Sequence, residues 1–148
     1  MARTRVIWAK KLPEVYSKLD EIDKVIAGHL EGSLLELVKL RSSVINGCSF
    51  CVDLHTRVAL KQGETQRRLF LVSAWYEAGA VFTDAERAAL ALTDEMTRLG
   101  ERGVSDETYD AAAEHFDDQQ LAALMSAIAM INLYNRLAVT SHLHPPAN

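Results

Sequence analysis

The sequence predicts an all-α fold in a single domain, and three observations carry this prediction. Apolar residues recur every three to four positions along most of the 148 residues, and no stretch alternates with period two for long enough to form a strand. The 7 glycines and 3 prolines are few and fall at the ends of the periodic segments. Hydrophobic residues make up 49% of the chain, so one domain of this length can bury a core without a disulfide or a metal ion.

The predicted helices follow one another with recognisable starts and ends. Pro13 suits a first helical turn, Thr65 and Ser105 are typical N-caps, and Thr83 begins a capping-box pattern. The pair Asn46-Gly47 suits a left-handed turn at a helix end. We expect six to seven helices, over about 13–27, 33–46, 48–63, 65–79, 83–99, a short one from 105, and 117–139, followed by a tail at 142–148.

Charge and hydropathy exclude several classes of partner. Sixteen Lys and Arg against 20 Asp and Glu give a net charge of −4, and the basic residues are scattered, which argues against nucleic acid. The apolar stretch 6–9 is much shorter than the core of an export signal. The uncharged segment 119–135 is too short and too polar for a membrane span, so it predicts a buried helix. We therefore expect a cytoplasmic protein with neither nucleic acid nor membrane as a partner.

The two cysteines, Cys48 and Cys51, are the residues most indicative of function. In a chain without an export signal they are expected to be reduced at rest, so their close spacing indicates redox or metal chemistry. On a helix, Cys48, Cys51 and His55 fall within about 60° of one another, with Leu54 and Val58 beside them. This face predicts a partly apolar pocket in which a reversible Cys48–Cys51 disulfide is sterically reasonable.

Either cysteine could be activated. Cys48 lies at the predicted start of a helix, where the dipole favours a thiolate. Cys51 lies four residues before His55, and side chains at that spacing meet on a helix, so His55 could exchange its proton. Spacing alone does not decide between them.

Around these residues the chain resembles the AhpD-like alkylhydroperoxidases of the carboxymuconolactone decarboxylase superfamily. The resemblance covers about residues 33–100, with a similar closing helix near the C-terminus. Its motif is a Glu twelve residues before the first cysteine, a CxxC pair, and a His four residues after the second cysteine. The matching segments are Glu36-Leu-Val-Lys-Leu-Arg41, Ile45-Asn-Gly-Cys48-Ser-Phe-Cys51-Val-Asp-Leu-His55-Thr-Arg57 and Ile131-Asn-Leu-Tyr-Asn-Arg-Leu-Ala138.

This resemblance implies a thiol-dependent peroxidase that reduces organic hydroperoxides. Cys51 would attack the hydroperoxide and become a sulfenic acid, and Cys48 would resolve it as a disulfide. Glu36 and His55 would form the proton relay. The best-known members carry His immediately before the second cysteine, where this chain has Phe50, so we expect weaker activation of Cys51.

The resemblance also implies homo-oligomers, trimers or hexamers. Apolar residues cover more than one face of the last helix, which an isolated domain would struggle to bury. These residues are Leu121, Leu124, Met125, Ile128, Met130, Ile131, Leu133 and Leu137. No Gly-rich phosphate loop, flavin motif or haem motif is present, so no cofactor is expected and electrons must come from an external dithiol or another protein.

Two other interpretations compete with catalysis. The chain could be a non-catalytic helical binding module with two inert, buried thiols. It could also hold zinc through both cysteines and His55, with Glu36 or His29 as the fourth ligand.

Several further residues carry structural expectations. Glu36 lies at the edge of an apolar arc and, on its own, predicts a solvated helix residue. Arg41 falls inside that arc, so it needs a buried carboxylate partner. Asp53 points away from the cysteine face, towards solvent, and Trp75 and Tyr76 are expected in the core, at a subunit contact or against the peroxide pocket. The surface or tail histidines are expected to be His29, His115, His142 and His144.

Overall fold

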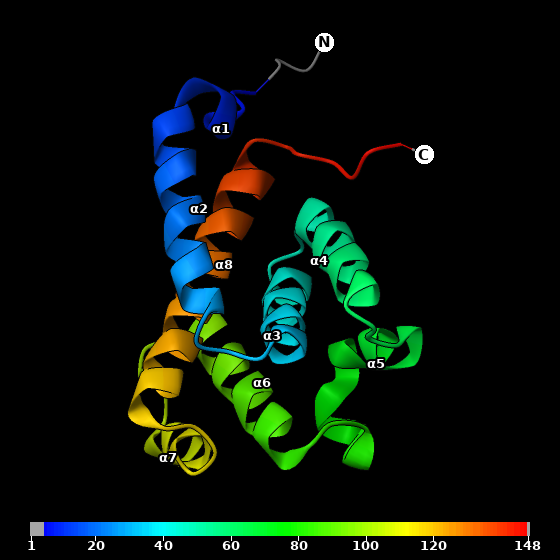
Figure 1. The fold of residues 1–148 in the computed structure, drawn as a ribbon, viewed down its shortest axis with the longest axis vertical. Helices are drawn as coiled ribbons and strands as arrows, with labels where there is room; N and C mark the ends of the chain where they lie inside the picture. Colours follow the sequence, from blue (N-terminus) through cyan, green and yellow to red (C-terminus); the bar gives the residue numbers. More distant parts are fainter. Residues whose placement is uncertain (1–4, 148) are drawn as a thin grey trace.

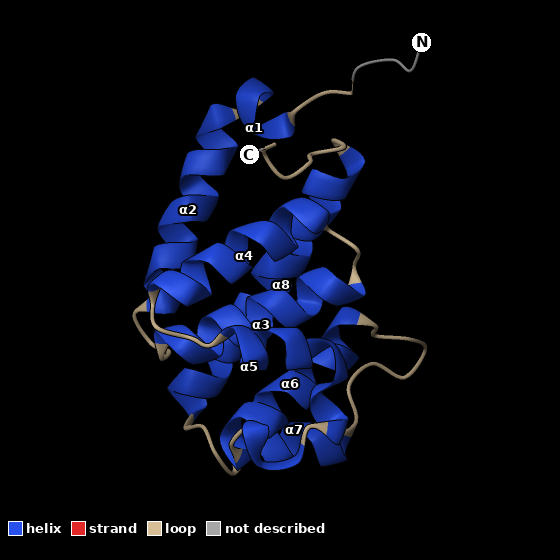
Figure 2. Ribbon diagram, turned by 90° about the vertical axis from the view of Figure 1, so that its right-hand side faces the viewer, coloured by secondary structure: helices blue, strands red, loops and turns tan. Residues whose placement is uncertain are grey.

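The structure is a computed structural model that describes residues 5–147, and no strand is found in that range. It confirms the all-α prediction (Figures 1 and 2). The helices are α1 (Trp8–Lys11), α2 (Pro13–Ala27), α3 (Gly32–Ile45), α4 (Ser49–Lys61), α5 (Gln66–Leu71), the 3₁₀ helices η1 (Val72–Glu77) and η2 (Gly79–Val81), α6 (Asp84–Thr97), α7 (Asp106–Ala113) and α8 (Asp118–Thr140).

The predicted helix starts are confirmed by their caps. The Thr65 and Ser105 hydroxyls accept backbone hydrogen bonds from the first turns of α5 and α7. Thr83 and Asp117 each form a complete capping box, with Glu86 and Gln120 respectively. These local bonds satisfy amides at the helix ends, which explains why the sequence predicted the boundaries well.

The predicted helix over 65–79 is wrong as a continuous element. Only its first part is α-helical, as α5. The rest of the segment forms 3₁₀ turns, with a kink at Ala74 (φ −129°, ψ 37°). Two arginines distant in sequence donate to carbonyls that an α-helix would use internally. Arg41 donates to the Ser73 carbonyl at 3.0 Å, and Arg87 donates to the Trp75 carbonyl at 3.3 Å. These side chains stabilise the irregular path.

Helix α3 lies at the centre of the fold. It packs against α4, α6 and α8, and its residues 34–43 are all buried (Figure 2). Arg41 within this stretch donates two hydrogen bonds to the Asp94 carboxylate, at 2.6 and 3.0 Å, which confirms the predicted buried ion pair. Because α3 is enclosed on all sides, even its polar side chains must find partners inside the protein.

A second ion-pair network fixes α5 to α6. Arg68 donates to the carboxylates of Glu64 and Glu86, at 2.9 and 2.6 Å. Burial raises the pKa of Glu64, but hydrogen bonds from the Thr65 amide, Arg68 and Ser33 outweigh it and leave that pKa below its usual value. The carboxylate of Glu64 is therefore ionised and strongly held near neutral pH.

Helix α8 crosses the molecule and packs against α2, α3 and α6. It is the one helix of residues 5–147 that is long and apolar enough to cross a membrane by length and composition, a property that core helices share. The sequence predicted that one chain could not bury all the apolar side chains of this helix, but most of them are covered within the chain. Leu121, Leu124, Ile128 and Ile131 are buried, Met130, Leu133 and Leu137 are half-buried, and Met125 is exposed.

Helix α8 therefore buries most of its apolar surface within one chain and gives little support for an oligomer. Exposed apolar side chains lie instead on α2, where Val15, Ile22 and Val25 are 44%, 49% and 67% exposed. The oligomeric state stays a prediction.

Candidate active site

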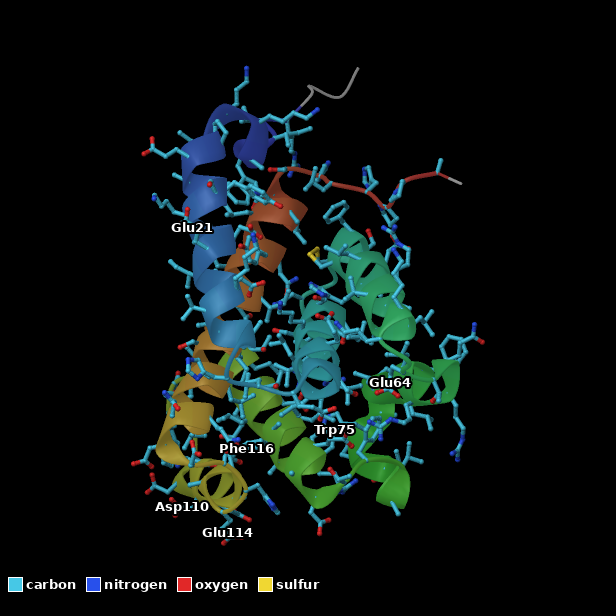
Figure 3. All side chains as sticks on the ribbon, viewed as in Figure 1. Glu21, Glu64, Trp75, Asp110, Glu114 and Phe116 are labelled. Carbon is cyan, nitrogen blue, oxygen red and sulfur yellow. A yellow bond between two sulfur atoms is a disulfide. The ribbon has the colours of Figure 1, made fainter. Side chains whose placement is uncertain are left out.

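The cysteine pair lies at the start of α4, which follows α3 after a tight turn. Gly47 supplies the left-handed conformation of that turn (φ +65°), which the sequence predicted. Cys48 is the N-cap of α4, and its sulfur accepts a hydrogen bond from the Cys51 amide at 3.3 Å. Cys48 and Cys51 form a disulfide, with their Cα atoms 5.3 Å apart (Figure 3, yellow bond between α4 and α8). The expected disulfide pairing is therefore present.

Both cysteines are almost completely covered, but their surroundings differ. Cys48 is 2% and Cys51 4% exposed. Cys51 lines a pocket of about 520 Å³ bounded by residues of α1, α2, α3, α4 and α8, whereas Cys48 does not line it. Phe50, Leu54 and His55 of α4 also line this pocket, so the predicted partly apolar environment is present around Cys51. The geometry separates the two sulfurs, which spacing alone could not do.

His55 and Glu36 form a buried pair beside the disulfide. His55 Nδ1 lies 2.8 Å from Glu36 Oε2, and the two side chains are 12% and 7% exposed. With Nδ1 directed at the carboxylate, Nε2 is the ring nitrogen left to exchange a proton in the pocket. Glu36 does not itself line the pocket, so it acts on the pocket only through His55.

All four predicted site residues, Cys48, Cys51, His55 and Glu36, are thus brought together by α3 and α4. One expectation about them was wrong: Glu36 is not a solvated helix residue, because α4 covers it and His55 supplies its hydrogen bond.

The far wall of the pocket was missed by the sequence interpretation. It contains the rings of Trp8, Tyr16 and Tyr134, from α1, α2 and α8. Burial raises the pKa of Tyr134 to about 12, so its hydroxyl stays protonated at neutral pH. Trp75 and Tyr76, which were considered for this wall, do not line the pocket. No local signal could have found these rings, because three separate helices bring them together.

A partly buried ion pair, also missed, lies in the same pocket. The Lys39 ammonium donates to Asp23 Oδ2 at 3.0 Å, and the two side chains are 9% and 25% exposed. Both residues line the pocket. Lys39 is three residues after Glu36, so both project from one face of α3, and this spacing could have drawn attention to it.

The remaining predicted residues lie away from the pocket. Asp53 pairs with Arg57 at the surface at 2.7 Å. The four histidines expected at the surface or in the tail are exposed. Within residues 5–147, no group of three or more His, Cys, Asp and Glu side chains is arranged to hold a metal ion.

Comparison with known proteins places this site in a family. The model of the carboxymuconolactone decarboxylase family matches residues 11–95, more than half of the chain. The chain belongs to the carboxymuconolactone decarboxylase family. Within this family it is AhpD-like, as the Glu36, CxxC and His55 pattern predicted.

Three proteins are similar to this chain in sequence or in fold. YdfG of Bacillus subtilis, an uncharacterised protein, is 40% identical over 104 residues, which are 70% of each chain. ATU0492 of Agrobacterium tumefaciens, a protein of unknown function provisionally described as the antioxidant defence protein AhpD, has a structure with a TM-score of 0.92. It is 34% identical, and the match covers 99% of this chain and 100% of that one. The debrominase Bmp8, crystallised as a cysteine-to-alanine variant with 2,3,4-tribromopyrrole, shares the fold at 18% identity, with a TM-score of 0.81 and coverage of 93% and 74%.

The region that matches the family model contains the cysteine pair, His55 and Glu36 but not the whole pocket. Residues 36–55 lie inside the matched range, whereas Trp8 and the α8 residues lie outside it. The family match thus covers the cysteine pair and its histidine more fully than the opposite wall of the pocket.

Proposed function

We propose that this protein is a thiol-dependent peroxidase that reduces organic hydroperoxides through a cysteine sulfenic acid and a disulfide. One observation carries the proposal: Cys51 lines a partly apolar pocket together with His55, while its disulfide partner Cys48 lies behind it at the start of α4. A nucleophile that borders a pocket and a resolving thiol that lies outside that pocket are the arrangement that this cycle needs.

In the first step His55 takes the thiol proton of Cys51, and the thiolate attacks the terminal oxygen of ROOH. The O–O bond breaks, the sulfur is oxidised to Cys51–SOH, and the departing alkoxide receives the proton from His55 and leaves as ROH. Glu36 accepts a hydrogen bond from His55 Nδ1 and so holds the ring in place. Glu36 is therefore a positioning residue rather than the direct acid.

In the second step the Cys48 thiol attacks the Cys51 sulfur. The S–S bond forms, the S–O bond breaks, and water leaves. Cys48 is the N-cap of α4 and Cys51 lies in its first turn, where the helix dipole favours the thiolate form. An external dithiol, either a small molecule or a protein, then reduces the disulfide. One of its thiols attacks a sulfur of the pair, which breaks the Cys48–Cys51 bond and forms a mixed disulfide. Its second thiol then releases the protein cysteine, so that the donor leaves as a disulfide.

The working form is proposed to be a homo-oligomer, a trimer or a hexamer. The exposed apolar side chains of α2 support an interface there, since isolated domains seldom expose several such residues together.

The test uses protein reduced with dithiothreitol and then freed of it, mixed with one equivalent of cumene hydroperoxide. Cys51→Ser should abolish peroxide consumption, and Cys48→Ser should consume one equivalent and leave a sulfenic acid that dimedone traps. Ser49→Ala, at an exposed position between the two cysteines, is the matched control and should behave as wild type.

If both cysteine variants consumed peroxide at the wild-type rate, the peroxidatic role of Cys51 would be refuted. Stoichiometric zinc in reduced protein purified without added metal, combined with no peroxide consumption, would favour the metal-holding interpretation.

A further inference from the structure

The pocket beside Cys51 has walls more specific than a general hydroperoxide site requires. We propose that it selects neutral hydroperoxides that carry an aromatic ring and rejects those that carry a carboxylate. This proposal rests on the proposed peroxidase function and names its substrate class.

The first support is an aromatic wall. The Trp8 ring lies 5.8 Å from that of Tyr16 and 6.4 Å from that of Tyr134, and both pairs are tilted rather than stacked face to face. Phe50 adds a fourth ring from the side of α4. Edge-to-face and offset contacts at such separations are the ones that aromatic rings prefer. A volume of about 520 Å³ suits one small organic molecule.

The second support is the charge of the pocket. Its charged lining groups are Asp20 and Asp23 from α2, Lys39 from α3 and, when protonated, His55 from α4. The ammonium of Lys39 is already paired with Asp23 at 3.0 Å. A carboxylate entering the pocket would face two carboxylates and a cation already engaged, and like charges in a partly desolvated site repel strongly.

The third support is an available hydrogen-bond acceptor. Asp23 Oδ1 is buried, and no residue among 5–147 donates a hydrogen bond to it. The hydroxyl of a hydroperoxide can donate to such an oxygen, whether or not the same molecule also carries a carboxylate. This oxygen therefore favours the hydroperoxide group of a substrate, and the discrimination against a carboxylate elsewhere in the molecule comes from the charged groups of the pocket.

The test compares three substrates with the wild-type enzyme under dithiothreitol. These are cumene hydroperoxide, its para-carboxylate derivative, and tert-butyl hydroperoxide, which lacks a ring. We expect kcat/KM for cumene hydroperoxide to exceed that for the carboxylate derivative by about tenfold or more. It should exceed that for tert-butyl hydroperoxide by about threefold to tenfold. Equal values for all three would overturn the proposal.

Two variants, each with a matched control, test whether the preference for a ring depends on the aromatic wall and the rejection of a carboxylate on the acidic side chains. Trp8→Ala should bring the ratio of the cumene to the tert-butyl substrate towards one, whereas Tyr76→Ala, an exposed aromatic residue outside the pocket, should leave it unchanged. Asp20→Asn should raise the ratio of kcat/KM for the carboxylate derivative to kcat/KM for cumene hydroperoxide by about threefold or more. Glu21→Gln, at the next position on α2 and pointing away from the pocket (Figure 3), should not. A control that changed the ratios as much as its partner would refute the assignment.

A binding measurement separates failure of this proposal from failure of the peroxidase function. The product alcohol 2-phenyl-2-propanol and its para-carboxylate derivative are titrated into the oxidised protein, with binding followed by saturation-transfer NMR. The neutral alcohol should bind, and the carboxylate should bind at least about tenfold more weakly. If the protein bound the neutral alcohol more tightly than the carboxylate but turned over no hydroperoxide, the peroxidase function alone would be refuted. Turnover with equal binding of both alcohols would refute the pocket proposal alone.

Discussion

Replacing Glu36 with glutamine tests whether a buried carboxylate works through His55. The hydrogen bond from His55 Nδ1 to Glu36 Oε2 is 2.8 Å long and nearly excluded from water. Hydrogen bonds to charged groups contribute roughly 1.5–3 kcal/mol, against about 0.5–1.5 kcal/mol for neutral ones. Glutamine keeps a bond and loses the charge, so about 1–1.5 kcal/mol is lost, which corresponds to roughly a tenfold decrease in kcat/KM. His55→Ala removes the proton carrier itself and should cost about 10²–10⁴-fold.

The assay is single-turnover reduction of cumene hydroperoxide, with Glu31→Gln as the control. Glu31 lies exposed at the N-cap of α3 and makes no side-chain cap bond, so its variant should react as wild type. A parallel alkylation with iodoacetamide in the Cys48→Ser background reports the pKa of the Cys51 thiol. The alkylation rate should show an inflection with pH that lies below the pKa of about 8.5 of an unperturbed thiol, nearer 7 than 4. His55→Ala should move this inflection to higher pH.

The relative loss of kcat/KM in Glu36→Gln and His55→Ala shows whether Glu36 acts through His55. If Glu36→Gln were as damaging as His55→Ala, Glu36 would have to contact the reacting group itself, which contradicts its position outside the pocket. If Glu36→Gln had no effect on turnover, the pair would be a structural contact. An alkylation profile that followed an unperturbed thiol in every variant would refute activation of Cys51 altogether.

Other predictions concern stability, acid sensitivity, assembly and activation. Arg68→Met strands the carboxylates of Glu64 and Glu86 and should destabilise the fold by about 3–5 kcal/mol, lowering Tm by roughly 6–20 °C in thermal circular dichroism, whereas exposed Arg67→Met should not. The folded pKa of Glu64 is lowered, so its contribution is fully present above the unfolded pKa of about 4.3 and is lost as pH falls through the folded value; Glu64→Gln should flatten urea-measured stability in that window. Light scattering should show a mass several times the 16.4 kDa of one chain, and a monomer at micromolar concentration would contradict the proposed oligomer. Phe50→His places an imidazole beside Cys51 and should lower the alkylation inflection of that thiol by about one unit, with no shift as the contrary result.

The part of the site that the sequence could predict is the part built by local geometry. Cys51 and His55 share a face of α4 because they are four residues apart, and Cys48 lies at a helix start because Gly47 ends the preceding turn. Glu36 came from the family resemblance, since nothing in its own helix pattern distinguished it from a surface residue. Its burial depends on the packing of α4 against α3, which periodicity does not specify.

The failures share one physical cause, which is a partner distant in sequence. The segment 65–79 has the periodicity of one helix, but Arg41 and Arg87 bind its carbonyls and stabilise 3₁₀ turns instead. Helix α1 was not expected, because four residues are too few to show a period. Its Trp8 acquires a role only through the rings of Tyr16 and Tyr134, which lie on other helices.

Local contacts and contacts between distant segments also build different parts of the proposed active site. The thiol pair and its histidine are positioned by α3 and α4, whose mutual packing is among the most extensive in the fold. The aromatic and acidic walls come from α1, α2 and α8, which reach the pocket from the two ends of the chain. Substitutions in those three helices can therefore alter which hydroperoxide is bound without moving Cys51 relative to His55. We expect substrate preference to change in variants whose alkylation profile stays wild type, and changes in the two properties that always occurred together would contradict this separation.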